Sequence, residues 1–374
     1  WNFNGGDLKG NGTFHNYLGA IVYIYGVLDV DLSWQLLVYN AGEFRKMNGG
    51  IFTHYATFFH NLSGGLVHIV DGEYRFKGGF YNYGSITYAG LGKLCGCGGT
   101  FYNENGGEAS NGRVVIRNAS LVVNWAFDVK HFELEDGAQV FGPLEVKVID
   151  GGTFTWIGGT IEASAIIDIA VNVITTFNPV ASVFCHGIIH HRGTWNFEGG
   201  KLFGNGVFNN LSAGLILITG TSDPTDSWRV VLNNSGIYRM NCGCAFRHAF
   251  GTFTNLVGGK LEVLQGTLLL DGVFSGDQYG EILVSLGATL NLTTAVDWRG
   301  TKAISHGLLQ CPDFRFKGAV TQEMGGDGTF THIRIDNGAG VDLSGHVKVS
   351  ITIILVNGHV RCGDYRITLE NPLV

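Results

Sequence analysis

The residues best suited to metal or redox chemistry are the cysteines and histidines of the 374-residue chain. Cysteine occurs twice in a Cys-Gly-Cys motif, at residues 95–97 and 242–244, and once in the segment CHGIIHH at residues 185–191. Thiolate and imidazole groups are the ligands that zinc prefers, so a metal site would be sought in these segments. Whether their side chains can meet depends on the fold.

Grouped carboxylates are the second candidate for chemistry, because enzymes that cleave polysaccharides bring two of them together in one groove. Asp29 and Asp31 would share one face of a strand, and the segment ELED occupies residues 133–136. The matching segments later in the chain are DPTD at 223–226, which is typical of a turn, and RIDN at 334–337. No carboxylate set is repeated, so we expect no catalytic residues, no metal and no cofactor.

The elements that carry these residues are repeats. Residues 1–16, WNFNGGDLKGNGTFHN, match residues 195–210, WNFEGGKLFGNGVFNN, at eleven of sixteen positions. The match continues without a gap, since Trp34 falls on Trp228. We therefore expect a first unit over residues 1–194 and a duplicated second unit over 195–374, joined as one continuous rod.

A shorter period lies inside each unit. An apolar residue followed two positions later by Asn recurs at spacings of 24 and then 21 residues. A fixed period near twenty residues predicts a solenoid, whose coils cover their apolar faces only by stacking. The Asn residues of this pattern are Asn16, Asn40, Asn61, Asn82, Asn103 and Asn124 in the first unit, and Asn210, Asn234 and Asn255 in the second.

Each coil is expected to consist of short strands. Alternating runs such as residues 74–77 are interrupted every few residues by glycine, and no window has apolar residues at helical spacing. Twenty-one residues accommodate three strands and three bends, so the fold class is all-β, a parallel β-helix, which we expect to be right-handed. The recurring Asn would form a structural ladder, each amide bonding to the coils above and below, or would serve as a simple turn former.

This fold restricts what the cysteines can do. Disulfide partners on neighbouring coils would lie about one coil apart, yet successive cysteine sites are separated by 88, 57, 67 and 51 residues. We therefore expect buried thiols or bonds between chains. The two Cys-Gly-Cys motifs cannot share a metal across so many coils, and the histidines near residue 190 are interpreted as hydrogen-bonded corner residues.

Carbohydrate is expected as a covalent or bound partner. Glycosylation sequons place acceptors at Asn11, Asn118, Asn233 and Asn291, and also at the two ladder residues Asn61 and Asn210, which cannot both stack inside a turn and carry a glycan. Aromatic side chains could also stack on sugar rings. The candidates for such stacking are Tyr23, Tyr25, Trp34, Tyr39 and Tyr55.

Composition excludes several classes of partner. The net charge is −7 without a basic run, which disfavours nucleic acid, and no apolar stretch approaches the roughly 20 residues that span a bilayer. Charged residues make up only 15%, which suggests that something other than water covers part of the surface. The first residue is Trp1, not Met, so we expect a processed chain or part of a longer one.

The segments GTFTWIGGTIEA at 152–163, GTWNFEGGKLFGNGVFNN at 193–210 and FELEDGAQVFG at 132–142 resemble secreted parallel β-helix repeat proteins, namely filamentous-haemagglutinin and autotransporter-passenger adhesins and extracellular fibre proteins. The resemblance implies an extracellular or cell-surface location and transfers no active site. We expect a structural subunit of a fibre, sheath or appendage that binds copies of itself end to end. A carbohydrate-binding adhesin stalk is the alternative, and a polysaccharide lyase or hydrolase the third possibility.

Overall fold

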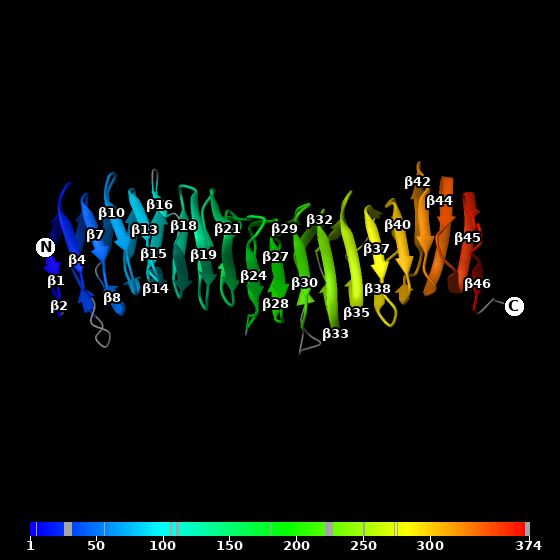
Figure 1. Ribbon diagram of the computed structural model, residues 1–374, viewed down its shortest axis with the longest axis horizontal. Helices are drawn as coiled ribbons and strands as arrows, with labels where there is room; N and C mark the ends of the chain where they lie inside the picture. The colour runs from blue at the N-terminus through cyan, green and yellow to red at the C-terminus, as the bar shows by residue number, and fades with distance from the viewer. Residues whose placement is uncertain are drawn as a thin grey trace. The chain divides into compact units, whose positions relative to one another are not determined.

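The computed structural model describes residues 1–4, 6–25, 32–55, 57–104, 107–109, 112–179, 181–220, 227–249, 251–272, 274 and 276–370. Asp29, Asp31 and the segment 223–226 lie outside these ranges. Every regular element in the described ranges is a β-strand, and none is a helix that could cross a membrane (Figure 1). The fold is a parallel β-solenoid, as predicted.

One coil consists of three strands, and the fourth strand returns to lie beside the first. Strands β11 (Glu73–Phe76), β12 (Gly79–Asn82) and β13 (Ser85–Tyr88) form such a coil. The next strand, β14 (Lys93–Cys97), pairs in parallel with β11, so that Glu73 lies opposite Lys93. The coil repeat follows from the register, which places Asn61 opposite Asn82 and Asn82 opposite Asn103.

The chain divides into two compact units, Trp1–Ile189 and His190–Val374. In the first unit, the strands of one face are β1 (Asn2–Phe3), β4 (Ile21–Ile24), β7 (Glu43–Lys46), β10 (Leu66–Ile69), β13, β16 (Glu108–Ala109) and β23 (Ile166–Ile169). The second face consists of β2 (Asp7–Leu8), β5 (Leu32–Trp34), β8 (Ile51–His54), β11, β14, β17 (Arg113–Arg117) and β24 (Ile174–Phe177). The third consists of β3 (Thr13–Asn16), β6 (Leu37–Asn40), β9 (Phe58–Asn61), β12, β15 (Thr100–Asn103), β18 (Ser120–Val123), β20 (Gln139–Phe141), β22 (Thr160–Ile161) and β25 (Val183–Cys185). The longer strands β19 (Phe127–Leu134) and β21 (Glu145–Trp156) bend between the first two faces. Strand β26 (Ile188–His191) contains the boundary between the units.

The second unit has the same three-faced coils. One face contains β27 (Thr194–Phe197), β30 (Leu215–Ile218), β37 (Glu281–Val284), β40 (Lys302–Ser305) and β43 (Gln322–Gly325). Another contains β28 (Lys201–Phe203), β31 (Ser227–Trp228), β38 (Thr289–Leu292), β41 (Leu308–Gln310) and β46 (Ile367–Leu369). The third contains β29 (Val207–Asn210), β32 (Val231–Asn234), β34 (Phe253–Asn255), β36 (Gly276–Gln278), β39 (Val296–Trp298) and β42 (Phe314–Gly318). Four long strands turn corners between faces: β33 (Ile237–Ala249), β35 (Lys260–Asp271), β44 (Thr329–Leu343) and β45 (Val347–Arg361).

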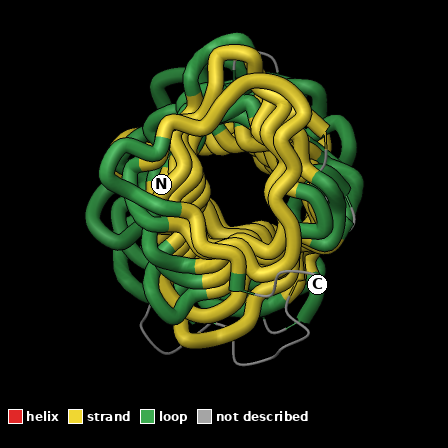
Figure 2. Tube along the Cα trace, turned by 90° about the vertical axis from the view of Figure 1, so that its right-hand side faces the viewer, coloured by secondary structure: helices red, strands yellow, loops and turns green. Residues whose placement is uncertain are grey.

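Alternation along each strand builds the core, because every second side chain points into the coil. In Figure 2 strands line the inside of the coils and turns lie outside. In the first unit the interior is aromatic: Trp34 packs against Phe44 and Phe52 with ring centroids 5.6 Å away in each case, and Phe59 stacks on Phe80 at 4.9 Å. Trp34 is completely buried and so is a core residue, which corrects its proposal as a sugar-stacking side chain.

Candidate functional site

A column of buried asparagine side chains runs along the third face of the first unit. The side-chain amide of each Asn donates to the Oδ1 of the Asn in the next coil. The Nδ2···Oδ1 distances are 2.7 Å from Asn16 to Asn40, 2.8 Å from Asn40 to Asn61, 2.9 Å from Asn61 to Asn82 and 3.0 Å from Asn82 to Asn103. Amides of the column also reach backbone carbonyls, such as Ser85 O from Asn61 at 3.1 Å, so the column satisfies polar groups that the coil corner buries.

Asn124 does not belong to this column, which corrects its assignment from spacing. The structure pairs Asn103 with Val123, so this coil is one residue shorter than the pattern implied. A slip of one residue moves a side chain to the opposite face of a strand. Asn124 is therefore exposed beyond the end of β18, and its amide donates to Glu104 at 3.1 Å. The amide of Asn103 donates instead to the carbonyl of Trp125 at 2.6 Å.

The second unit has its own column, which begins with a histidine. Asn210 donates to Asn234 and Asn234 to Asn255, both at 2.7 Å. His191 Nδ1 lies 3.0 Å from Asn210 Oδ1, and since an amide oxygen only accepts, the imidazole carries its proton on Nδ1. Burial lowers the pKa of His191 to about 4, so the ring is neutral at neutral pH. No regular spacing in the sequence points to this histidine.

In the first unit, a column of aromatic rings lies on the outer side of the third face, the face that also carries the asparagine column. His15, Tyr39, His60, Tyr81 and Tyr102 stack in order, with centroid separations of 5.1, 4.9, 4.9 and 4.4 Å and interplanar angles of 11° or less. Each ring covers the faces of its neighbours, so mainly ring edges point outward. A platform for a sugar needs a free ring face.

The other aromatic candidates are also engaged. Tyr23 and Tyr25 stack on each other with their centroids 6.0 Å apart, and the guanidinium of Arg45 lies over Tyr23. Tyr55 is 45% exposed, but Lys77 Nζ lies 4.7 Å from its ring centroid. The contacts of Arg45 with Tyr23 and of Lys77 with Tyr55 are cation–π interactions.

The sequon asparagines differ in exposure. Asn11 and Asn118 are exposed, whereas Asn233 and Asn291 are half-buried. Asn233 also donates from Nδ2 to Asn209 at 2.9 Å. The two acceptors that belong to the columns, Asn61 and Asn210, are completely buried. The exposed pair is therefore the best placed to receive a glycan.

The cysteine pairs differ from expectation. Cys95 and Cys97 form a disulfide within one strand, with their Cα atoms 5.5 Å apart, and Cys242 and Cys244 form another, at 5.2 Å. The prediction of free thiols or interchain bonds was wrong for these four residues, because it considered only bonds between coils. Each bond joins two cysteines that are two positions apart, whose side chains lie on the same face of one strand.

Two of the remaining cysteines, Cys185 and Cys311, are buried free thiols. Burial raises the pKa of each to about 12, so neither forms a reactive thiolate. Near Cys185, His191 belongs to the second column and His190 lies 3.4 Å from the amide of Asn209. Among the described residues, the group with metal-ligating geometry is Glu73, Cys95 and Cys97.

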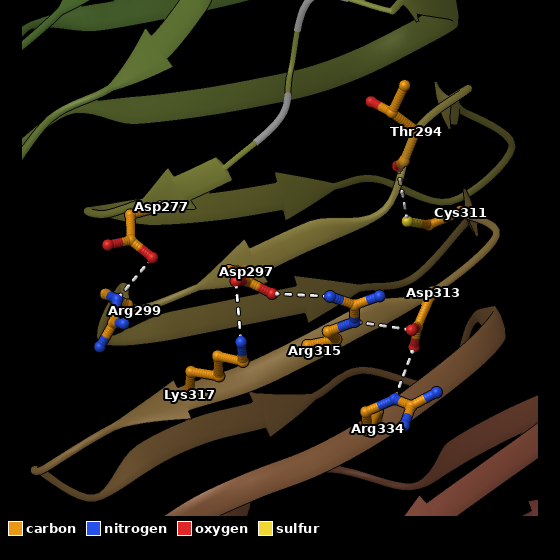
Figure 3. Close-up of polar contacts among 9 residues, drawn as sticks. All are labelled: Asp277, Thr294, Asp297, Arg299, Cys311, Asp313, Arg315, Lys317 and Arg334. Carbon is orange, nitrogen blue, oxygen red and sulfur yellow. Dashed lines mark hydrogen bonds and ion pairs between the residues drawn. The ribbon is translucent and has the colours of Figure 1, made fainter.

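A network of charged side chains covers the outer surface of β36, β39, β42 and β44 (Figure 3). Asp297 accepts from Lys317 at 2.8 Å and from Arg315 at 3.4 Å. Asp313 binds both Arg315 (2.6 Å) and Arg334 (3.2 Å). Cys311 beside it donates to the carbonyl of Thr294 at 3.4 Å.

This network does not have the properties of a general acid. Burial acts to raise the pKa of Asp313, but hydrogen bonds from Arg315 and Arg334 bring the pKa below its usual value. A carboxyl group that protonates a glycosidic oxygen needs a raised pKa instead. Each carboxylate drawn in Figure 3 is neutralised by a cation, which is the arrangement of a surface ion-pair network.

Comparison of the sequence with protein-family models and with curated proteins finds no match. The fold and the geometry of its columns are therefore the basis for assigning a function.

Proposed function

We propose that this chain is a structural subunit of an extracellular fibre, sheath or surface appendage, and that it assembles end to end through its stacked coils. The observation that carries the proposal is the apolar surface of strand β45. Its Leu355 lies in register with Ile335, which is completely buried, yet Leu355 is 60% exposed. Side chains that continue the core columns of the preceding coil are thus open to solvent.

The exposed surface extends along the same strand. Ile351, Ile354 and Val356 are 45%, 39% and 55% exposed. Exposed apolar residues scattered singly are ordinary, but four within six residues of one strand favour burial against another surface. A β-strand edge in addition offers backbone donors and acceptors to a further strand.

A matching surface lies on the first coil. Trp1 is 55% exposed, whereas Trp195, which occupies the equivalent position of the duplicated sequence, is completely buried. Trp1 already packs on Phe14 and Trp34, with ring centroids 5.2 and 5.5 Å away. We propose that the exposed part of this ring contacts the apolar coil of another copy. A contact between two different surfaces does not close on itself, so it produces filaments.

The two columns suit a structural role. Where they occur, the amide column and the outer ring column tie neighbouring coils together, in addition to the parallel strand pairing. The extracellular assignment is supported by the resemblance to secreted β-helix proteins and by the exposed sequons at Asn11 and Asn118.

Assembly is tested with a charge placed on the exposed coil. We expect the purified protein to form filaments or growing oligomers as its concentration increases, as measured by light scattering and electron microscopy. Leu355→Asp should fold normally, because the side chain is mostly exposed, and should remain monomeric. Leu286→Asp is the matched control, since Leu286 is 82% exposed at the turn between β37 and β38 and is not part of β45.

Two results would contradict the proposal. One is a wild-type protein that stays monomeric at every concentration. The other is a Leu355→Asp variant that assembles as readily as the Leu286→Asp control. A monomer that is retained on immobilised polysaccharide would support the adhesin stalk instead.

A further inference from the structure

The Cys95–Cys97 disulfide lies on the outer surface of strand β14. Side chains alternate along this strand, and positions 94 and 96 face the interior. The side chains of Cys95 and Cys97 therefore lie on the outward side. A side chain at Gly96 would meet Phe76 and Ile116, whose nearest carbons are 3.0 and 3.4 Å from the position of a Cβ. Glycine thus lets the strand pack tightly between the two cysteines.

This bond contributes little to holding the fold. It joins residues two apart in one strand, and a disulfide that closes so short a loop removes little entropy from the unfolded chain. It does not link two coils. Strand β14 is already paired over its length with β11 on one side and β17 on the other.

The two cysteine residues differ in exposure. Cys95 is completely buried beneath its neighbours, whereas Cys97 is half-buried and reaches the surface. Thiol–disulfide exchange requires one sulfur that an incoming thiolate can reach and a second that can leave and return. The pair has this asymmetry.

Charged groups surround the accessible sulfur. Glu73 Oε1 lies 3.9 Å from Cys97 Sγ, and the same carboxylate binds Arg75 and Lys93, at 2.5 and 2.9 Å. Arg117 lies opposite Cys97 in the register with β17. Arg75 and Lys93 offset the charge of Glu73, the carboxylate that lies next to Cys97. The same cations oppose binding of a metal ion by Glu73 and the two thiols.

We propose that Cys95–Cys97 is a thiol–disulfide exchange site for small thiols. A thiolate RS⁻ attacks Sγ of Cys97, the bond between the cysteines breaks, and Cys95 leaves as a thiolate that takes up a proton. A second RS⁻ attacks the R-group sulfur of the mixed disulfide, releasing RSSR and the Cys97 thiolate, which is protonated in turn. The protein disulfide and two RSH thus become a protein dithiol and RSSR, and the reverse sequence restores the bond.

The first test uses the native protein and glutathione as the probe. The protein is incubated at a series of ratios of reduced to oxidised glutathione, quenched with N-ethylmaleimide and mapped by mass spectrometry. We expect the reduced fraction of Cys95–Cys97 to follow the ratio and to reach the same value from either direction. The reduced fraction is read from the label on the half-buried Cys97, whereas the buried Cys185 and Cys311 should stay unlabelled at every ratio.

The second test separates the roles of the two sulfurs. In Cys95→Ser the remaining Cys97 should form a mixed disulfide with glutathione, at least tenfold faster than Cys95 does in Cys97→Ser. Circular dichroism checks that both variants fold. Should either variant misfold, the wild-type titration alone decides.

The proposal is overturned if the bond stays oxidised in the native protein at the most reducing ratio, while urea-unfolded protein is reduced under the same conditions. Equal rates of glutathione addition in the two folded variants would also overturn it, because the order of attack rests on the difference in exposure.

Discussion

A single ladder amide binds several partners at once, and this explains why asparagine recurs in the coils. Asn61 accepts from Asn40, donates to Asn82 and also donates to the carbonyl of Ser85. All four groups are buried or partly buried, where a polar atom without a partner is costly. A residue of similar size without an amide cannot take this place.

The first prediction concerns Asn82, in the middle of the column. Asn82→Leu removes the acceptor of Asn61 and the donor to Asn103, so the free energy of unfolding should fall by about 3 kcal/mol. Asn124→Leu is the matched control, because Asn124 fits the sequence pattern but is exposed; its effect should stay within about 0.5 kcal/mol. Urea unfolding measures both. Equal losses in the two variants would contradict the column.

Buried histidines make stability depend on pH. Burial lowers the pKa of His54, His191 and His248 to about 4, while the unfolded chain protonates near 6.5. Between these values the unfolded state binds more protons, so stability is full above about pH 6.5 and decreases as pH falls towards 4.

The second prediction follows from this window. The unfolding free energy should decrease between pH 6.5 and 5. In His54→Gln its slope against pH should be smaller, by the equivalent of up to one bound proton. Denaturant unfolding at several pH values gives the slopes. An unchanged slope in His54→Gln would show that the ring is not buried in its neutral form.

The residues also show how far the sequence predicts the structure. A spacing of 21 places Asn40, Asn61, Asn82 and Asn103 on one column, because equal coil lengths bring equal positions into register. The spacing fails at Asn124, where one coil is shortened by a residue. Neither a coil length nor a bond between residues two apart leaves a periodic signal, so Asn124 and the two disulfides could not be assigned from spacing.

At the scale of the coil, glycine is required at the corners because a side chain there would have no room. After the ladder Asn residues come Gly42, Gly65, Gly84 and Gly107. A Cβ at Gly84 would collide with the carbonyl oxygens of Gly65 and Leu62 in the coil beside it. The corner of one coil therefore fits against the backbone of the preceding coil only without a side chain.

The third prediction tests this fit. Gly84→Ala should lower the unfolding free energy by about 2 kcal/mol or more, because backbone atoms must move. Gly12→Ala is the control, since a Cβ there meets only Leu36 at 3.8 Å, an ordinary contact. Thermal unfolding compares the two. If Gly84→Ala is as stable as Gly12→Ala, the coils are packed less tightly than the structure shows.

At the scale of the whole molecule, the duplication was readable from sequence because the matching segments are long and without gaps. The two units differ on their outer surfaces. The stacked rings His15 and Tyr39 of the first unit correspond to Asn209 and Asn233 in the second. Outward positions are free to differ because they do not fill the core. The fold is thus repeated while the surface is not.

The fourth prediction concerns that surface. When the protein is expressed through a secretory pathway, Asn11 and Asn118 should carry glycans, with lower occupancy at the half-buried Asn233 and Asn291. Asn61 and Asn210 should remain unmodified, since both are buried in the columns. Peptide mapping after glycosidase treatment in heavy-oxygen water gives the occupancy. Sugar on Asn61 and Asn210 alone would contradict their burial.

The asparagine column also has a direction. From Asn16 to Asn103 every side-chain amide donates towards the later coil, and from His191 to Asn255 the direction is the same. Aligned amide dipoles add, and each polarises the next. Each coil within these two columns therefore presents a lone-pair face on one side and an N–H face on the other. A further coil can join the series only in one orientation, which gives any fibre of such coils a built-in polarity.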